Sequence, residues 1–345
     1  MKTIKIDNRK IGDKGNSFII AEGGINHNGD INIAKELISA AVESNADAIK
    51  FQIFNTELFY SASHKGFAQT GKEIIKLLKS LEFSEKGWFE LKEFADKKNI
   101  IFFASVFDDK SFDIAEKIDI PAYKIASGDI NFLPFLEKIG KTGKPVILST
   151  GMSNIKDIST AVSEIEKTGN KKISILQCIS LYPAPYNLMN LKTIKTIAKA
   201  FGYPAGLSDH TEGYHISLAA IAMGAKIIEK HFTLDKNMKG PDHKLSISPK
   251  EFKDMVKQIR DIEKALGNGY KKGPVGDEKK SVDLARRGLY AKKTVKAGDS
   301  ISSDNTIFKR PAADYIKPED FKFIVGKKLK NGKKDGEGIK YKDLV

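Results

Sequence analysis

The sequence predicts a parallel α/β fold, a TIM (β/α)8 barrel, with a small β-rich domain after it. Short apolar runs alternate with segments of helical periodicity along most of the chain, which is typical of a parallel sheet covered by helices. Eight strand–helix units precede residue 267, and such barrels usually take about 250 residues. A doubly wound sheet is the competing architecture, but no G-x-G-x-x-G turn follows the first predicted strand. These observations favour the barrel.

The predicted strands are short apolar runs, and they lie at 18–22, 46–52, 100–105, 121–127, 145–150, 173–178, 204–209 and 225–232. Helical patterns between them include INIAKELISAAVES, EKGWFELKEFADKK, LPFLEKIGK and ISLAAIAMG, and KEFKDMVKQIRDIEKALG follows the eighth strand. In the second of these patterns, Trp88, Phe89 and Phe94 fit the face that would pack on the core.

The chain is expected to divide into a barrel at 1–266, a linker at 267–282 and a small β-rich domain at 283–345. The glycine- and lysine-rich stretch GNGYKKGPVGDEKK ends the helical pattern, which is typical of a connecting segment. The runs that follow are β-like and are separated by AGD, RPAAD and GEG. Their low apolar content indicates that this domain packs on something else, such as another subunit.

Composition narrows the function classes. The formal net charge is +14, but the lysines are scattered, and the densest basic run, GKKLKNGKKDG, has no interleaved aromatic residues, so nucleic-acid binding is not expected. No apolar run reaches the ~18 residues of a membrane span, and the segment MKTIKIDNRKIGDKGN lacks the apolar core of a secretory signal. A single cysteine, Cys178, excludes an intramolecular disulfide and fits a reducing cytoplasm. The excess positive charge would help to attract a small anionic substrate.

Polar side chains gather where the predicted strands end, which is where barrel enzymes carry their chemistry. Because side chains alternate along a strand, residues two apart share a face. The strand ends and the residues just beyond them supply Glu22, Lys50, Gln52, Ser105, Lys124, Ser127, Ser149, Cys178, Ser180, Tyr182, Ser208, His210, Glu229 and His231, and Asp242 and His243 follow in a loop. A buried charge is costly unless it is paired or coordinated. So many polar strand ends favour a charged ligand and a metal ion.

His210 and His231 end adjacent strands, and two neutral imidazoles with oxygen ligands suit Mn²⁺, Zn²⁺ or Fe²⁺. The alternative is that each histidine only forms hydrogen bonds within the barrel mouth. Lys50 and Lys124, together with the serine hydroxyls, suit a phosphate or carboxylate, although serines can also satisfy the backbone at strand ends.

Two other residue types are interpreted as structural or left without a role. Cys178 is expected to be a small core residue, because no activating base lies near it in the sequence. His64 and His215 lie in loop or helix settings and are assigned no role.

The motifs AEGGINHNGD, IKFQ, YKIASGD, ILSTGM, LQCISLYPAP, GLSDHT, IEKHFT and GPDHKLS occur in this order. Together they resemble the sialic acid synthase family, which makes N-acetylneuraminate and related nine-carbon sugars. The segment GLYAKKTVKAGDSISSDNTIFKRP resembles that family's C-terminal antifreeze-like domain, also called the SAF domain.

This resemblance implies a TIM barrel followed by a small β-clip domain, in a homodimer that exchanges its SAF domains. The implied reaction condenses phosphoenolpyruvate with an N-acylated mannosamine in its open-chain aldehyde form, and releases phosphate by C–O cleavage. It also implies a divalent cofactor, Mn²⁺ or Mg²⁺, that activates the aldehyde as a Lewis acid.

Carried over to matching positions, the resemblance assigns roles to individual residues. His210 and His231 would bind the metal, and Glu22 and Glu229 would stabilise positive charge at C2 of phosphoenolpyruvate. Phosphoenolpyruvate would be held by Lys50, Ser105, Lys124, Ser127, Ser149, Ser180 and Ser208. The sugar would be contacted by Gln52, Tyr182, Asp242 and, across the dimer, Arg310.

Two segments depart from the family pattern. The chain has ASVFDD where the family usually has S-T-P-F-D, so Ser105 replaces a threonine but keeps a hydroxyl for anion binding. RPAAD replaces a glycine-containing RPG segment after Arg310, which leaves the loop shape there open.

Several functions remain open on the sequence. Within the family, a legionaminate or pseudaminate synthase would act on a 2,4-diacetamido-6-deoxy sugar, and phosphorylated N-acetylmannosamine is another acceptor. The residues that distinguish these sugars would lie in loops such as FNTELFYSASHKGFAQTGKE. Outside the family, a metal-dependent hydrolase or an aldolase would turn over without phosphoenolpyruvate. A polyanion-binding protein would bind in a salt-sensitive way that does not need His210 and His231.

Overall fold

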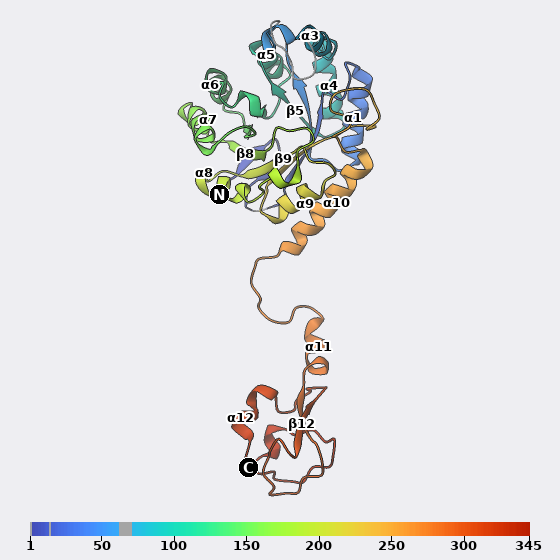
Figure 1. The fold of residues 1–345 in the computed structure, drawn as a ribbon, viewed down its shortest axis with the longest axis vertical. Helices are drawn as coiled ribbons and strands as arrows, with labels where there is room; N and C mark the ends of the chain where they lie inside the picture. The colour runs from blue at the N-terminus through green and yellow to red at the C-terminus, as the bar shows by residue number, and fades with distance from the viewer. Residues whose placement is uncertain (1, 14, 62–70) are drawn as a thin grey trace. The chain divides into compact units, whose positions relative to one another are not determined.

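Eight parallel strands close into a barrel in the computed structural model, which describes residues 2–13, 15–61 and 71–345 (Figure 1). Around the barrel the strands are β3 (Phe18–Gly24), β4 (Ala48–Ile53), β5 (Ile101–Val106), β6 (Tyr123–Ile125), β7 (Val146–Ser149), β8 (Ile173–Cys178), β9 (Ala205–Asp209) and β10 (Ile227–His231). β10 pairs with both β9 and β3, and this closes the ring. The predicted fold class is confirmed, and each of the eight predicted strands overlaps an observed one.

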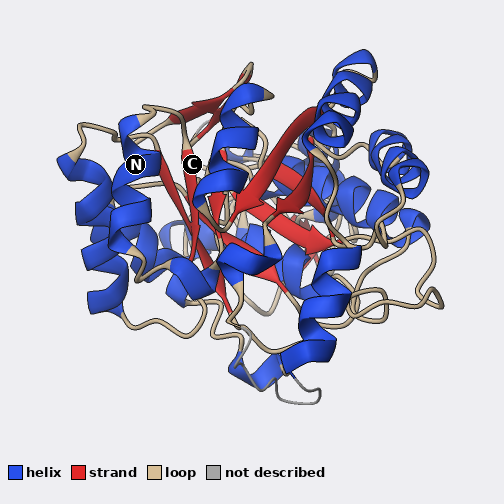
Figure 2. Cartoon of the chain, turned by 90° about the horizontal axis from the view of Figure 1, so that it is seen from above, coloured by secondary structure: helices blue, strands red, loops and turns tan. Residues whose placement is uncertain are grey.

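Helices surround these strands (Figure 2). The main ones are α1 (Ile31–Glu43), α4 (Glu85–Lys97), α5 (Asp109–Lys117), α6 (Leu133–Lys141), α7 (Ile155–Lys167), α8 (Thr193–Phe201), α9 (His215–Ala222) and α10 (Pro249–Leu266), and the β4–α4 connection carries α2 (Thr56–Phe59) and α3 (Gly71–Ser80). Capping residues set where several begin: the side chains of Asp108, Asn154 and Ser248 accept hydrogen bonds from the first turns of α5, α7 and α10.

The predicted burial of the aromatic residues of α4 is only partly correct. Trp88 is 2% exposed and Phe94 packs partly buried against the core, but Phe89 is 43% exposed, so its assignment to the core face was wrong. Neighbouring residues on a helix point about 100° apart. Trp88 therefore takes the inward direction, and Phe89 faces outward.

A hairpin of β1 (Ile4–Ile6) and β2 (Arg9–Ile11), which the sequence analysis did not predict, packs on the barrel. Ile4, Ile6 and Ile11 are almost fully buried and belong to the barrel's apolar core. Strands of three residues carry too little alternation to stand out in a sequence.

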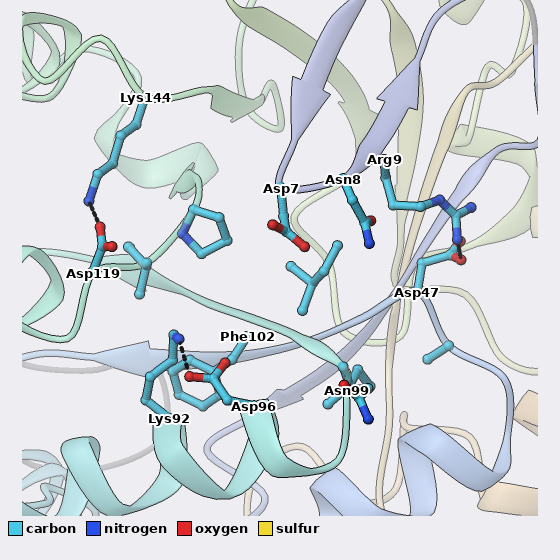
Figure 3. A pocket seen from close by; sticks show the side chains of 15 residues that line it. Asp7, Asn8, Arg9, Asp47, Lys92, Asp96, Asn99, Phe102, Asp119 and Lys144 are labelled. Atoms are coloured by element: carbon cyan, nitrogen blue, oxygen red, sulfur yellow. Dashed lines mark hydrogen bonds and ion pairs between the residues drawn. The ribbon is translucent and has the colours of Figure 1, made fainter.

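A cavity of about 580 Å³ lies between this hairpin and the amino ends of β4, β5 and β6 (Figure 3). Its charged side chains are largely paired with each other: Lys92 with Asp96 at 2.6 Å, Lys144 with Asp119 at 3.0 Å, and Arg9 with Asp47. Because it lies at the amino ends of these strands, the cavity is at the end of the barrel opposite the polar carboxyl ends.

The chain divides after Gly267 into two compact units, and the second, 268–345, has an apolar core of its own. In it β11 (Gly288–Ala291) pairs antiparallel with β12 (Thr306–Lys309), and a short helix α12 (Phe321–Ile324) follows.

The second unit begins with a helix, α11 (Glu278–Ala285), that crosses the predicted boundary between linker and domain. The expectation that helical structure stops there was wrong. α11 buries none of its residues, so it lacks the apolar stripe from which helices are predicted. No helix in the described part of the chain is long and apolar enough to cross a membrane.

Candidate active site

A belt of buried polar side chains lines the inside of the barrel at the carboxyl ends of the strands. It draws on seven of the eight strands and consists of Glu22, Lys50, Ser105, Lys124, Ser149, Ser208 and Glu229. Two positions earlier on the same strands, and so on the same inward face, the residues are fully buried and apolar, among them Ile20, Ala48, Phe103, Ile147 and Ile227. The belt therefore rests on an apolar layer, where charges interact strongly.

Lys50 is the centre of one half of this belt. Its Nζ lies 2.5 Å from Glu22 Oε2 and 3.7 Å from Glu229 Oε2, and it donates to Ser105 Oγ at 3.0 Å. β4 is the neighbour of both β3 and β5, so the register brings three strands to one ammonium group.

Lys124 is the centre of the other half. Its Nζ donates to Ser149 Oγ at 2.7 Å and lies 3.7 Å from Glu229 Oε1. Ser208 Oγ donates to the same Glu229 oxygen at 2.9 Å. Glu229 thus connects the two lysines, and the predicted cluster of these residues is present in the structure.

The surroundings push the pKa values of like groups apart. Burial, helped by repulsion from Glu229, raises the pKa of Glu22 although Lys50 opposes this. Burial would also raise the pKa of Glu229, but Lys124, Lys50 and the Ser208 hydroxyl hold it below its usual value. Likewise burial lowers the pKa of Lys124, whereas Glu22 and Glu229 outweigh burial and raise the pKa of Lys50. Acid–base sites commonly separate the pKa values of paired groups in this way.

Gly151 brings the chain close to two predicted anion-binding serines. Its N–H donates to Ser127 Oγ at 2.9 Å. A Cβ at this position would lie 2.1 Å from Ser180 Oγ and 2.9 Å from Ser127 Oγ. Only glycine lets these hydroxyls converge, so Gly151 belongs to the site. The sequence analysis did not assign it a role, although it follows directly after the polar end of β7.

His210 and His231 lie side by side, with ring centroids 5.3 Å apart, and the Tyr182 ring lies 4.2 Å from that of His210. The Nδ1 of His210 is 2.9 Å from the Ile179 carbonyl oxygen. Because a carbonyl oxygen only accepts, Nδ1 carries a proton, so Nε2 is the nitrogen that offers a lone pair when the ring is neutral. This is the arrangement of a histidine oriented to bind a metal through Nε2.

Cys178 is buried as predicted, but it is not isolated from a basic group. Its Sγ lies 3.8 Å from His210 Nδ1, a partner 32 positions further along the chain. β8 and β9 are neighbours in the barrel, which explains a contact that sequence proximity could not indicate.

A divalent ion fits between the histidines on the chemistry of the donors. His231 Nδ1 is buried without a hydrogen-bond partner, and Asp242 Oδ2 lies 3.8 Å from it. Burial, with repulsion from His210, holds the pKa of His231 well below its usual value, which keeps the ring neutral and able to donate a lone pair. Among the residues that the structure describes, no three His, Cys, Asp or Glu side chains gather for a metal ion. A metal here would take other ligands from water or substrate.

The predicted sugar contacts Gln52 and Asp242 meet Glu22 at Gly24. Gln52 Nε2 donates to Glu22 Oε1 at 3.3 Å. Gly24 has φ +52°, and a Cβ on it would lie 3.2 Å from that oxygen, 3.5 Å from Gln52 Nε2 and 3.7 Å from Asp242 Oδ2. Gly24 thus lies among all three side chains, and the sequence analysis assigned it no role. Burial raises the pKa of Asp242 to about 6.

The loop that carries Asp242 is tied to the β3–α1 connection. Ser246 Oγ donates to the Asp242 carbonyl at 2.6 Å, and Asn26 Nδ2 donates to Ser246 Oγ at 2.9 Å. His243 Nδ1 lies 2.7 Å from Thr233 Oγ1. Hydrogen bonds therefore connect the segments GGINHNGD and GPDHKLS, and the first segment fixes the position of the second.

Arg310 belongs to the second unit. Its side chain is exposed, without a hydrogen bond or ion pair to any residue in the described ranges. In the adjoining RPAAD segment Ala313 has φ +42°, so this loop contains a residue in the left-handed conformation although it has no glycine. His64, and residues 62–70 of the loop expected to distinguish sugars, lie outside the described residues.

Comparison with known proteins now places the chain. The model of the NeuB family matches residues 37–271, and that of the SAF domain matches residues 286–345. The chain belongs to the NeuB family. It is 44% identical to the N,N'-diacetyllegionaminic acid synthase of Campylobacter jejuni, over 92% of this chain and 98% of that protein. It is 36% identical to the N-acetylneuraminate-9-phosphate synthase of Mus musculus, over 93% of this chain and 90% of that protein.

Among solved structures, the N-acetylneuraminic acid synthetase of Leptospira borgpetersenii in complex with citrate superposes with a TM-score of 0.74. It is 39% identical, over 81% of this chain and 95% of that one. As a NeuB-family member, the chain is an enzyme of the sialic-acid-type synthases, and its second unit is a SAF domain. The predicted family resemblance is confirmed.

Proposed function

We propose that this enzyme condenses phosphoenolpyruvate with N-acetylmannosamine and water to give N-acetylneuraminate and phosphate. The observation that supports this most is the closed belt in which two buried lysines and several hydroxyls converge beside two carboxylates and two histidines. A lysine pair with convergent hydroxyls suits a substrate that carries both a phosphate and a carboxylate.

In this proposal Lys50 and Lys124, with Ser105, Ser127, Ser149, Ser180 and Ser208, hold the phosphoenolpyruvate anions. C3 of phosphoenolpyruvate attacks the aldehyde carbon and forms the new C–C bond, so positive charge develops at C2. Glu22 and Glu229 stabilise that charge. Water then adds at C2, and the C–O bond to phosphate breaks.

The water that adds at C2 loses both of its protons as the C2 carbonyl forms: one balances the proton gained by the new hydroxyl, and the other leaves with phosphate. Glu22 suits the transfer of these protons, because its raised pKa makes the carboxylate a better proton acceptor while its hydrogen bond from Gln52 fixes its position. His210 and His231 would hold Mn²⁺ or Mg²⁺, which when bound supplies Lewis acidity toward the aldehyde. Gln52, Tyr182 and Asp242 would contact the sugar.

We also propose a homodimer in which the SAF domain of one subunit covers the barrel mouth of its partner and contributes Arg310. Large apolar side chains stand exposed on the loops that follow β6, β7 and β8, namely Phe132, Met152, Leu181 and Tyr182. A cluster of this kind at a barrel mouth is typical of a surface that another protein covers.

Incubation of the purified protein with phosphoenolpyruvate, Mn²⁺ and one acceptor at a time tests the proposal. Phosphate release together with the mass of N-acetylneuraminate is expected with N-acetylmannosamine. The acceptors tested beside it are the 6-phosphate and the 2,4-diacetamido-6-deoxy sugars, because relatives carry the corresponding synthase names. Turnover of any acceptor without phosphoenolpyruvate would instead indicate a hydrolase or aldolase.

A further inference from the structure

A buried ion pair lies on the outside of the barrel wall, directly behind the two histidines. Asp209 and Lys230 are register partners on β9 and β10, their side chains are 0% exposed, and Lys230 Nζ lies 3.3 Å from Asp209 Oδ2. Each precedes a histidine in the sequence. Because side chains alternate, the pair points away from the barrel interior while His210 and His231 point into it.

This pair fixes the backbone on both sides of His210. Asp209 Oδ1 accepts hydrogen bonds from Thr211 N at 2.9 Å and from Thr211 Oγ1 at 2.7 Å. Lys230 Nζ donates to the Thr211 carbonyl at 2.5 Å. His210 is therefore held between two residues that are tied to each other, and the tie includes a side chain from the strand that carries His231.

The network also reaches the helix that covers these strands. Asp209 Oδ2 accepts a hydrogen bond from Ser217 Oγ, on α9, at 2.6 Å. Among the described residues, Asp209 thus bonds to Thr211, Ser217 and Lys230, which all bear on the turn after β9.

We propose that Asp209 and Lys230 are positioning residues that set the separation and orientation of His210 and His231 for a divalent ion. This inference rests on the proposed metal-dependent function. The paired register of β9 and β10 ends at Asp209 and Lys230, so the strand ends that carry the two histidines can still twist relative to each other. A buried bond between their outward side chains removes that freedom, and metal sites depend on such outer contacts.

Stability alone accounts poorly for this pair. A buried ion pair often contributes no more to stability than apolar side chains of similar size, because both charges lose their hydration. The position of the pair behind both histidines offers a reason, other than stability, for keeping these two charges buried.

The test is the double variant Asp209→Asn/Lys230→Met, which removes both charges but keeps an oxygen for the Thr211 N–H. Calorimetric titration with Mn²⁺ should show affinity about 10–100-fold below that of the wild type, as for other outer contacts of metal ligands. The melting temperature should stay within about 5 °C of the wild type. In the protein without metal, ¹⁵N NMR of the neutral His210 ring should show one tautomer in the wild type, with the proton on Nδ1. In the variant it should show a mixture of the Nδ1 and Nε2 tautomers.

Asp47→Asn is the matched control. The Asp47 side chain is only 6% exposed and is paired with two arginines, one of them Arg260 at 2.9 Å, but it lies at the amino end of β4. This variant should lose stability and bind Mn²⁺ as the wild type does. If the double variant unfolds, Ser217→Ala, which removes one hydrogen bond of the network, should still weaken Mn²⁺ binding measurably.

Mn²⁺ affinity of the folded double variant within twofold of the wild type would overturn the positioning role while leaving the metal site intact. A wild type that binds no Mn²⁺, or a His210→Ala variant that binds as tightly as the wild type, would overturn the metal assignment itself. The two failures are therefore distinguishable.

Discussion

Lys50 and Glu22 face each other across two neighbouring strands inside the barrel, with Nζ 2.5 Å from Oε2 and both side chains almost fully buried. The same ammonium group lies 3.7 Å from Glu229. One lysine therefore separates two carboxylates that would otherwise repel each other in a medium of low dielectric constant.

Replacing Lys50 with methionine should reduce turnover of phosphoenolpyruvate by about 100-fold or more, the usual effect of removing one preorganised electrostatic group. Without the ammonium group, which opposes the effect of burial, the pKa of Glu22 would rise further and its ionised form would be less favoured. Steady-state kinetics and thermal unfolding measure both effects. Lys50→Met/Glu22→Gln should recover stability but not turnover, and a single variant with wild-type turnover would contradict the assigned role.

Gly151→Ala should raise the KM for phosphoenolpyruvate about tenfold or more, because each lost hydrogen bond to a charged group is worth roughly 1.5–3 kcal/mol. The added Cβ would displace the hydroxyls of Ser180 and Ser127. Gly128→Ala is the control, since a Cβ at that nearby position meets nothing within 4 Å. Equal KM values for the two variants would remove Gly151 from the anion site.

His243→Phe should raise the acceptor KM severalfold while leaving the KM for phosphoenolpyruvate nearly unchanged. The phenyl side chain keeps a planar aromatic ring at this position but loses the bonds of the imidazole to Thr233 and Asn28, so the loop that presents Asp242 loosens. His215→Phe, at an exposed position at the start of α9, is the matched control. Equal changes in both KM values would mean that the whole mouth is disturbed.

His27 should make the protein less stable in mild acid. It is fully buried among Phe83, Trp88 and Phe51, and burial lowers its pKa from 6.5 to about 4. Between these values the unfolded chain binds the proton and the folded one does not, so stability is complete above about pH 6.5 and falls as the pH drops toward 4, by about 3 kcal/mol.

Denaturant unfolding of the wild type and of His27→Asn across this range measures that contribution. The asparagine Oδ1 can accept the Gly29 N–H that His27 Nδ1 accepts. The difference between the two proteins should change with pH. A constant difference would show that His27 does not titrate in this window.

Arg310→Ala should raise the acceptor KM, and Lys309→Ala, at the exposed position before it, should not. At an acceptor concentration too low for Arg310→Ala to turn over, a mixture of this variant with the inactive His210→Ala should regain turnover after subunit exchange. In a dimer that shares its sites, about a quarter of them would combine an intact barrel with an intact partner arginine. No recovery despite exchange would place Arg310 outside the partner's site.

The sequence predicted the barrel and its polar belt well because both follow from local regularities. Strand alternation alone placed Glu22, Lys50, Glu229 and their neighbours on one face, and the parallel topology brought that face together. The family motifs then supplied roles that alternation cannot.

What sequence reasoning missed depends on contacts between distant segments. Gly24 and Gly151 matter because of side chains that approach them from other strands. Asp209 and Lys230 look like ordinary surface charges at outward strand positions, but elements packed outside the barrel, α9 among them, bury them. The prediction for Phe89 was wrong for the opposite reason, since no neighbouring element covers this side chain enough to bury it.

The charges of the belt cancel, since two ammonium groups stand against two carboxylates. The belt by itself is thus close to electroneutral. Phosphoenolpyruvate would add several negative charges, and a divalent ion at His210 and His231 would add two positive ones. Each would then strengthen the binding of the other by the same factor, as linkage requires. Because the charges of the belt already cancel, we expect the metal ion and phosphoenolpyruvate to bind cooperatively.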